Sequence, residues 1–244
     1  MPETVWNIRF DEGGLHFRYR FIDKGLSRAV VFFPGLRARG RTDIEHYNRL
    51  TWAELVNASC LFVADPGLTS EVRGTWFQGN SKVYSVEAVS RHVTTILQRF
   101  GIDQRDCTLY GSSQGGFAAM ASGAFMPSAR IVAEAPQTDV ARFGGVDDVN
   151  SAARACYGVS TMAEVPKQFN VRLRLADLYK ARGYTPRSTV LIKRSDLHHV
   201  DAHLHPLLEE IGDRRISVEM FDDLGEAGHT PLPKEIVIDR LNSL

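Results

Sequence analysis

The stretch Cys107-Thr108-Leu109-Tyr110-Gly111-Ser112-Ser113-Gln114-Gly115-Gly116-Phe117 decides how this 244-residue chain folds. Residues 107–110 predict a short buried strand, and the small residues after Gly115 predict a helix that packs closely on a sheet. The chain must turn sharply between the two, so we expect Ser113 to have unfavourable backbone angles. Side chains two positions before and after it would collide there, and Gly111 and Gly115 avoid that collision. The stretch therefore predicts a serine held out on a tight strand-to-helix turn.

Strands and helices alternate on both sides of this turn. Alternating apolar residues from Val5 to Phe21, around Gly13-Gly14, predict a β-hairpin. The unbroken apolar runs 29–33 and 60–64 predict strands that are buried on both faces, as in a parallel sheet. Further strands are expected at 129–133, 189–192 and 216–221, and helices at about 50–58, 81–100, 115–125, 173–181, 202–211 and 233–244.

This order predicts an α/β fold in which a mostly parallel sheet carries an antiparallel N-terminal hairpin and helices on both faces. The length suits a single domain over residues 1–244. The stretch 137–182 is the least regular, and we expect it to form a small cap or insertion.

The charge balance excludes some classes of partner. Lys+Arg and Asp+Glu both number 29, so no overall field attracts nucleic acid or an anionic membrane. The three cysteines are too few and too far apart for a disulfide framework. Neither a signal peptide nor an apolar run of membrane-spanning length is evident. We therefore expect a soluble, cytoplasmic protein, without nucleic acid, membrane span or cofactor; the oligomeric state is left open.

A serine hydroxyl is a weak nucleophile at neutral pH and needs a base, which in turn needs an orienting acid. His229 follows the last predicted strand, shortly before the final helix. Asp196 follows the strand 189–192, where a buried carboxylate would hold the imidazole in the required tautomer. Other carboxylates stay open as the acid: Asp201, which could instead cap the next helix, and more weakly Asp139 and Asp223.

An acyl-transfer reaction also needs donors for the negative charge on the substrate oxygen. The backbone N–H of Gln114 lies at a helix N-terminus and is the first candidate. The second is the N–H of Leu36, in the loop after the strand 29–33, with Gly35 as the alternative.

Three further residues are candidates for substrate binding, each with a plainer interpretation. Arg37 could bind an anionic group, or belong to a solvated loop. Trp76 could stack on a sugar or acyl chain, or pack in the core. His199 could contact substrate, or support the loop that carries Asp196.

The histidine-rich segment 198–205 raises a metal-site hypothesis. His199 and His203 share a helix face at i, i+4, with Asp201 nearby. No further cluster of cysteines or carboxylates joins them in the sequence, so we expect no metal and a polar helix start instead.

The turn at Ser113 and the order serine, acid, histidine resemble the α/β-hydrolase superfamily over nearly the whole chain. Short motifs are also similar to hydrolase-like capsule-biosynthesis proteins and to the accessory-secretion proteins that acetylate glycans. These motifs are Ala64-Asp65-Pro66, Trp76-Phe77-Gln78-Gly79, Tyr110 to Phe117, Ala135-Pro136-Gln137-Thr138-Asp139 and Ser195-Asp196-Leu197-His198-His199. The superfamily usually has His-Gly where this chain has Pro34-Gly35, so the assignment of the second oxyanion donor departs from the pattern.

The combined prediction is a serine hydrolase that cleaves an ester or thioester through an acyl-enzyme on Ser113. The resemblance implies an alternative, an O-acyltransferase that moves acetyl to or from a carbohydrate with the same residues. The substrate would be a small molecule or a glycan. Two alternative hypotheses belong to other functional classes. One is a non-catalytic scaffold that kept the fold, and the other is metal-dependent hydrolysis.

Overall fold

The computed structural model describes residues 3–212, 215–222 and 226–244. An eight-stranded sheet forms its centre, with strand order β1-β2-β4-β3-β5-β6-β7-β8. The strands are β1 (Thr4–Glu12), β2 (Leu15–Asp23), β3 (Ala29–Phe33), β4 (Ser59–Val63), β5 (Cys107–Ser112), β6 (Arg130–Glu134), β7 (Ser188–Lys193) and β8 (Ile216–Phe221). The helices are α1 (Ser85–Arg99), α2 (Gln114–Gly123), α3 (Val146–Tyr157), α4 (Asn170–Leu173), α5 (Leu175–Arg182), α6 (Leu197–His199), α7 (His205–Ile211) and α8 (Lys234–Asn242).

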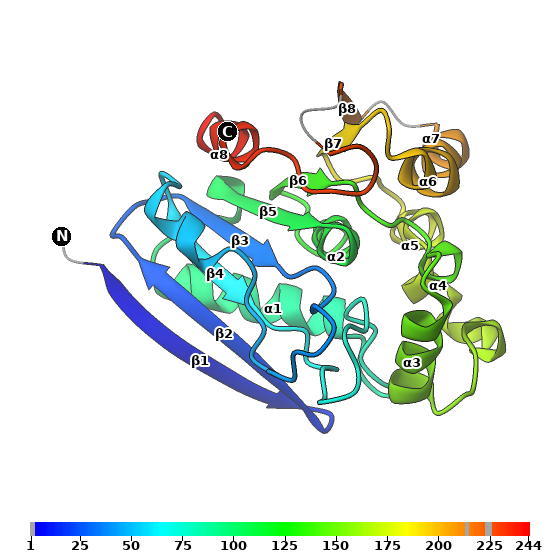
Figure 1. Ribbon diagram of the computed structural model, residues 1–244. Helices are drawn as coiled ribbons and strands as arrows, with labels where there is room; N and C mark the ends of the chain where they lie inside the picture. The colour runs from blue at the N-terminus through cyan, green and yellow to red at the C-terminus, as the bar shows by residue number, and fades with distance from the viewer. Residues whose placement is uncertain (1–2, 213–214, 223–225) are drawn as a thin grey trace.

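The sheet is mostly parallel, as the sequence predicts. β1 pairs with β2 and β2 with β4 in antiparallel fashion, and all the other neighbours are parallel. Figure 1 shows the long β1–β2 hairpin at one edge of the sheet and β8 at the other. The predicted fold class is therefore confirmed.

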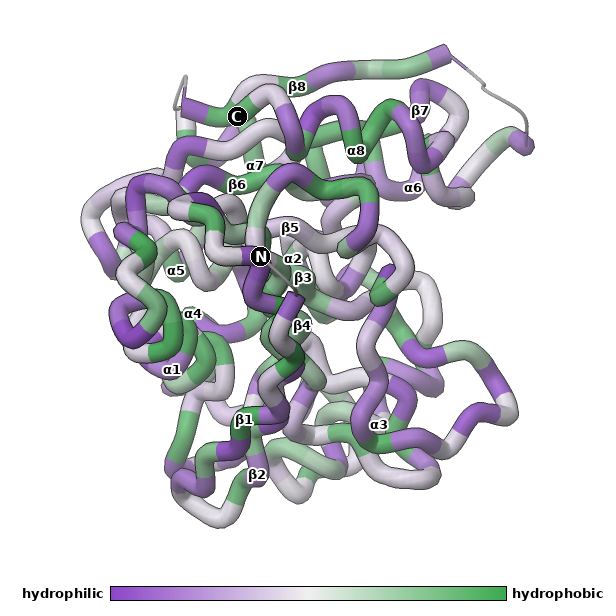
Figure 2. The backbone as a smooth tube through the Cα atoms, turned by 90° about the vertical axis from the view of Figure 1, so that its left-hand side faces the viewer, coloured by the Kyte–Doolittle hydropathy of each residue, from purple (hydrophilic) through white to green (hydrophobic). Residues whose placement is uncertain are grey.

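The unbroken apolar strands are buried on both faces. In β3, Val31 and Phe33 belong to the larger core cluster with α1 and α2, whereas Val30 and Phe32 belong to a second cluster. Trp52 contributes to that second cluster, together with residues of α8. Alternate side chains of one strand thus enter two cores, which explains why β3 lacks a polar face. In Figure 2 apolar stretches of the tube lie at β3 and β4 near the centre of the view and at α1 and α4 towards its left.

Two predicted helices are shorter than expected. The helix predicted from residue 81 begins at Ser85, because Asn80 Oδ1 accepts from the backbone N–H groups of Lys82 and Val83 and makes a turn there. The segment predicted helical over 50–58 forms only a 3-10 turn, Leu50–Glu54.

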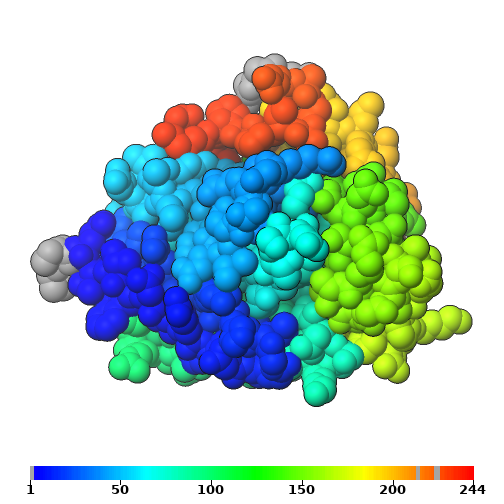
Figure 3. Space-filling model, turned by 60° about the horizontal axis from the view of Figure 1, so that its bottom comes forward, coloured from blue at the N-terminus to red at the C-terminus, as the bar shows by residue number. Residues whose placement is uncertain are grey.

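The segment 137–182 is more helical than the sequence prediction. It contains α3, α4 and α5, of which only the last was expected. The buried residues of α3 are Val149, Ala152, Ala153 and Cys156, a spacing of three and four that marks one helix face. Arg73 donates two hydrogen bonds to Asp148 of α3, at 3.0 and 2.9 Å, and ties it to the loop before α1. Figure 3 shows these two parts, green and cyan, side by side on one face. That this segment acts as a cap stays a prediction.

No helix within the described residues has both the length and the apolar character that a membrane crossing requires. All three cysteines are free and buried.

Candidate active site

Ser113 lies between β5 and α2 with backbone angles φ 55° and ψ −120°. These angles are strained for a residue with a side chain, and its N–H donates to Glu134 O at 2.9 Å, which holds the turn. A Cβ on Gly111 would lie 2.1 Å from the Gly115 carbonyl oxygen, and a Cβ on Gly115 would lie 2.4 Å from that of Phe33. Only glycine fits at either position, as the collision argument predicts.

His229 reaches Ser113 from the loop after β8. Its Nε2 lies 3.2 Å from Ser113 Oγ, and its Nδ1 lies 2.7 Å from Asp196 Oδ2. Lys193 Nζ donates to Thr230 Oγ1 at 2.6 Å, and Gly228 N donates to Ser195 Oγ at 2.9 Å. These bonds attach the His229 loop to the end of β7, where Asp196 also lies.

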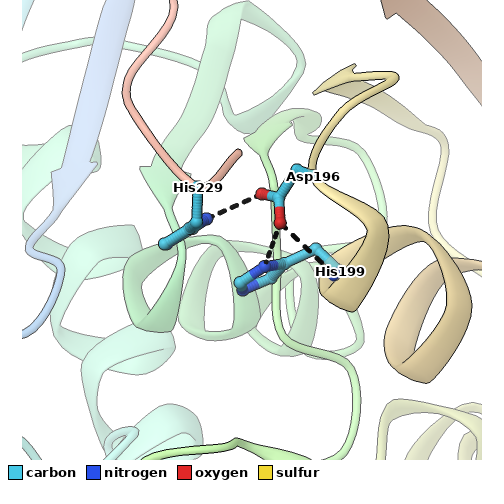
Figure 4. Close-up of side chains that lie close together, drawn as sticks. All are labelled: Asp196, His199 and His229. Atoms are coloured by element: carbon cyan, nitrogen blue, oxygen red, sulfur yellow. Dashed lines mark hydrogen bonds and ion pairs between the residues drawn. The ribbon is translucent and has the colours of Figure 1, made fainter. Parts of the chain in front are cut away.

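Asp196 is buried and accepts from two imidazoles. Oδ1 accepts from His199 Nδ1 at 2.9 Å, while Oδ2 faces His229 (Figure 4). Burial by itself would raise the pKa of this carboxyl, but the hydrogen bonds from His199 and His229 outweigh burial and hold the pKa well below its usual range. The two imidazole rings stack with centroids 3.9 Å apart and 14° between planes. An ionised carboxylate can stabilise the cation that forms when His229 takes a proton.

Gln137 is a contact of Ser113 that the sequence argument did not assign. It is fully buried, and its Nε2 lies 2.6 Å from Ser113 Oγ and 3.0 Å from His199 Nε2. Its Oε1 accepts from Trp76 Nε1 at 3.0 Å. The sequence signal for it was the motif Ala135-Pro136-Gln137, which by itself carries no indication of chemistry.

The predicted oxyanion donors follow the ends of two paired strands. Phe33 of β3 pairs with Gly111 of β5, so Leu36 and Gln114 each follow a paired position by three residues. Gln114 is the first residue of α2, and its N–H is among those that a helix leaves without an internal partner. Their role as donors stays a prediction.

A small hollow of about 50 Å³ opens beside the serine. Ser113, Ala135, His229 and Pro231 are among its lining residues, and so is Glu134. Glu134 is held by Arg49 at 2.9 Å, Tyr110 Oη at 2.7 Å and the Leu232 N–H at 2.6 Å. These bonds hold Glu134 in its place in the lining of the hollow.

The three candidates for substrate binding are buried. The Arg37 guanidinium is fully enclosed and donates to the carbonyls of Asp43, Thr69, Ser70 and Val72, so its donors hold the loop together. Trp76 is 0% exposed and positions Gln137. His199 contacts Asp196, as the plainer interpretation expected.

The rival acids lie elsewhere. Asp201 is exposed and is 3.6 Å from His205 Nδ1. Asp139 caps a 3-10 turn and pairs with Arg174 at 3.1 Å. Asp223 falls outside the described residues.

The histidine-rich segment does not gather the proposed ligands. His203 is buried, and its Nδ1 accepts from the Thr138 N–H at 3.2 Å. Burial and the neighbouring His199 and His198 lower the pKa of His203 to about 3, so it is neutral. The atoms that could share a metal are instead those of Asp196, His199 and His229, within 4.8 Å of one another. Both carboxylate oxygens there already accept from an imidazole N–H, which a metal would have to displace.

This chain is similar to known proteins in its three-dimensional structure. No protein-family model matches the sequence, and neither does any curated protein. The capsule O-acetyltransferase of Neisseria meningitidis serogroup A has 19% identity, with a TM-score of 0.66 over 96% of this chain and 94% of that chain. The glycosylation associate protein (Gap123) complex from Streptococcus agalactiae has 16% identity and a TM-score of 0.66, over 89% of this chain and 42% of that chain. Acetyl xylan esterase 1 from Thermoanaerobacterium sp. JW/SL YS485 has 13% identity and a TM-score of 0.67, over 99% of this chain and 83% of that chain.

Proposed function

We propose that this chain, which has the α/β-hydrolase fold, is a serine enzyme that cleaves an ester or thioester through an acyl-enzyme on Ser113. The observation that carries the proposal is the hydrogen-bonded path from Asp196 through His229 to Ser113, with steps of 2.7 and 3.2 Å. The path ends at a strained residue that lines a hollow, and backbone strain is commonly kept at functional sites.

The first half of the reaction forms the acyl-enzyme. Ser113 Oγ transfers its proton to His229 Nε2 and attacks the substrate carbonyl carbon. The N–H groups of Gln114 and Leu36 hold the oxyanion that forms. His229 then gives its proton to the leaving oxygen or sulfur, while Asp196 orients the ring and stabilises its cation.

The second half releases the acyl group. His229 takes a proton from water or from an acceptor hydroxyl, which attacks the acyl carbon. The bond from that carbon to Ser113 Oγ breaks, and Oγ regains its proton from His229.

The size of the hollow favours a short acyl group. About 50 Å³ is a few times the roughly 10–15 Å³ of cavity volume that one water needs. It suits an acetyl group better than a long chain. Two of the solved structures with this fold are named for acetyl chemistry, an O-acetyltransferase and an acetyl xylan esterase. They support the alternative, O-acetyl transfer to or from a carbohydrate hydroxyl, with the same three residues.

Labelling with a fluorophosphonate probe tests the proposal against the scaffold and metal readings. We expect labelling of the wild type that a chelator does not change and that Ser113→Ala abolishes. An unlabelled wild type would support the scaffold, and loss of labelling with chelator would support a metal.

Acyl p-nitrophenyl esters of increasing chain length test the acyl group. We expect acetyl and propionyl esters to react faster than octanoyl esters. Acetylated sugars, with and without an added acceptor carbohydrate, then separate hydrolysis from transfer.

The chain would form a single domain over residues 1–244, with a small cap or insertion at about 137–182.

A further inference from the structure

The orientation of the Gln137 carboxamide follows from its neighbours. An indole N–H only donates, so the Gln137 atom that faces Trp76 Nε1 at 3.0 Å is the acceptor oxygen Oε1. The other end is therefore the NH₂ group, which only donates. It lies 2.6 Å from Ser113 Oγ and 3.0 Å from His199 Nε2.

The same reasoning fixes the tautomer of His199. Because Gln137 donates to Nε2, that nitrogen must accept, and the ring proton lies on Nδ1. His199 Nδ1 then donates to Asp196 Oδ1 at 2.9 Å, which is the bond that an ionised carboxylate needs. His199 is 2% exposed, and burial lowers its pKa.

At the serine, these donors and acceptors close a ring. Ser113 Oγ accepts from Gln137 and directs its own proton to His229 Nε2. His229 and His199 both donate to Asp196. A hydroxyl oxygen has two acceptor lone pairs, so one remains for the acyl carbon while Gln137 stays bonded.

We propose that Gln137 is a further catalytic residue, whose N–H stabilises the negative charge on Ser113 Oγ, while Trp76 and His199 are its positioning residues. This rests on the proposed function. Charge develops on Oγ as His229 takes its proton during the attack, and again, in the reverse of that step, as the bond from Oγ to the acyl carbon breaks during deacylation. A preorganised buried donor has its greatest effect at such an atom.

Backbone strain supports the assignment independently. Non-glycine residues with positive φ include Trp76 at 49°, Ser113 at 55° and Ala135 at 39°. Ser113 is a member of the ring, Trp76 donates to Gln137, and Ala135 lies two residues before Gln137, whereas Arg49 and Phe77, which also have positive φ, are not members. Such a conformation is unfavourable for a residue with a side chain and persists where the surroundings enforce it. Backbone strain is thus present at Trp76, Ser113 and Ala135, which carry or precede side chains that bond to one another.

Gln137→Met tests the proposal, since it keeps the side-chain length and removes the donor. Burst kinetics with p-nitrophenyl acetate measure acylation and deacylation separately, and fluorophosphonate labelling measures attack by Ser113. Removal of one preorganised donor lowers rates by about 10²–10³-fold. We expect losses of up to about that size in both acylation and deacylation, with the Kd of the noncovalent substrate complex unchanged.

Gln78→Met is the matched control. Gln78 is equally buried and bonds Trp76 O at 3.3 Å and Arg172 O at 2.9 Å, away from the serine. It should acylate and deacylate near the wild-type rates. Trp76→Phe tests the positioning role, because it keeps an aromatic ring and removes the bond to Gln137 Oε1, and it should show the deacylation defect in part. His199→Phe removes the bond to Asp196 Oδ1 as well, so a defect in that variant reports on the ring as a whole.

The outcomes separate the two proposals. If Ser113 of the wild type is not labelled, the proposed function fails and the role of Gln137 fails with it. If the wild type is labelled and a folded Gln137→Met deacylates as fast as Gln78→Met, only the role of Gln137 is overturned. If Gln137→Met does not fold, Trp76→Phe decides, because deacylation at the wild-type rate in that variant would overturn the proposal.

Discussion

Replacement of Asp196 with asparagine changes the centre of the site with almost no change of shape. Both carboxylate oxygens accept from an imidazole Nδ1, at 2.7 Å from His229 and 2.9 Å from His199. Asparagine keeps one acceptor oxygen and places an NH₂ group at the other position. One of the two imidazoles must then offer a lone pair at Nδ1 and carry its proton on Nε2.

The surroundings decide which imidazole changes. A proton on His199 Nε2 would face the Gln137 N–H, and a buried donor left without an acceptor costs about 1–3 kcal/mol. His229 has a side chain that is 42% exposed, and its Nε2 faces only a rotatable hydroxyl. We therefore expect His229 to take the wrong tautomer, so that it can no longer accept the proton of Ser113. The same change in a serine protease lowers kcat by about 10⁴-fold, and we expect that order of loss here.

The assay is kcat with p-nitrophenyl acetate, with the thermal midpoint measured on the same samples. Asp201→Asn is the control, because Asp201 is exposed and lies apart from the ring. A folded Asp196→Asn that keeps more than about a tenth of the wild-type kcat would refute the reasoning, since that corresponds to less than about 1.4 kcal/mol of transition-state stabilisation. A severe loss in Asp201→Asn instead would make Asp201 the acid.

Three further changes have defined expectations. A lower pH should narrow the difference in thermal midpoint between the wild type and Asp196→Asn. Because the pKa of Asp196 is lowered in the folded state, its carboxylate stabilises the fold at any pH above its unfolded pKa, near 4. That stabilisation is lost as the pH falls toward the folded pKa. Calorimetry at pH 7 and pH 3 checks this, and an unchanged difference contradicts it. Glu134→Gln leaves the half-buried Arg49 without its carboxylate partner, so the free energy of unfolding, measured with denaturant, should fall by about 3–5 kcal/mol. A fall of less than about 1 kcal/mol would show that the ion pair is screened by solvent like a surface pair. Arg37→Met should lower stability by leaving carbonyls unpaired, with KM unchanged; a stable variant with a raised KM would restore Arg37 as a substrate contact.

Much of the fold was predictable because its signals are local. The buried strands 29–33 and 60–64 show as unbroken apolar runs, and the turn at Ser113 shows as glycines at fixed offsets. The missed α3 carried a signal too, in the three- and four-residue spacing of its buried face. The late start of α1 was harder to predict, because it depends on one side chain, Asn80, which competes for backbone N–H groups.

By itself the sequence determined a serine on a sharp turn, with a histidine and an aspartate in the required order along the chain, because chain order and turn chemistry are local properties. Only the tertiary structure decided which groups meet. Trp76, Gln137 and His199 lie 61 and 62 residues apart in sequence, yet they share hydrogen bonds around Ser113. Such contacts arise where the carboxyl ends of paired parallel strands bring their loops to one edge of the sheet, and no local pattern encodes them. For the same reason Arg37 looked like an available charge in the sequence and is enclosed by carbonyls in the fold.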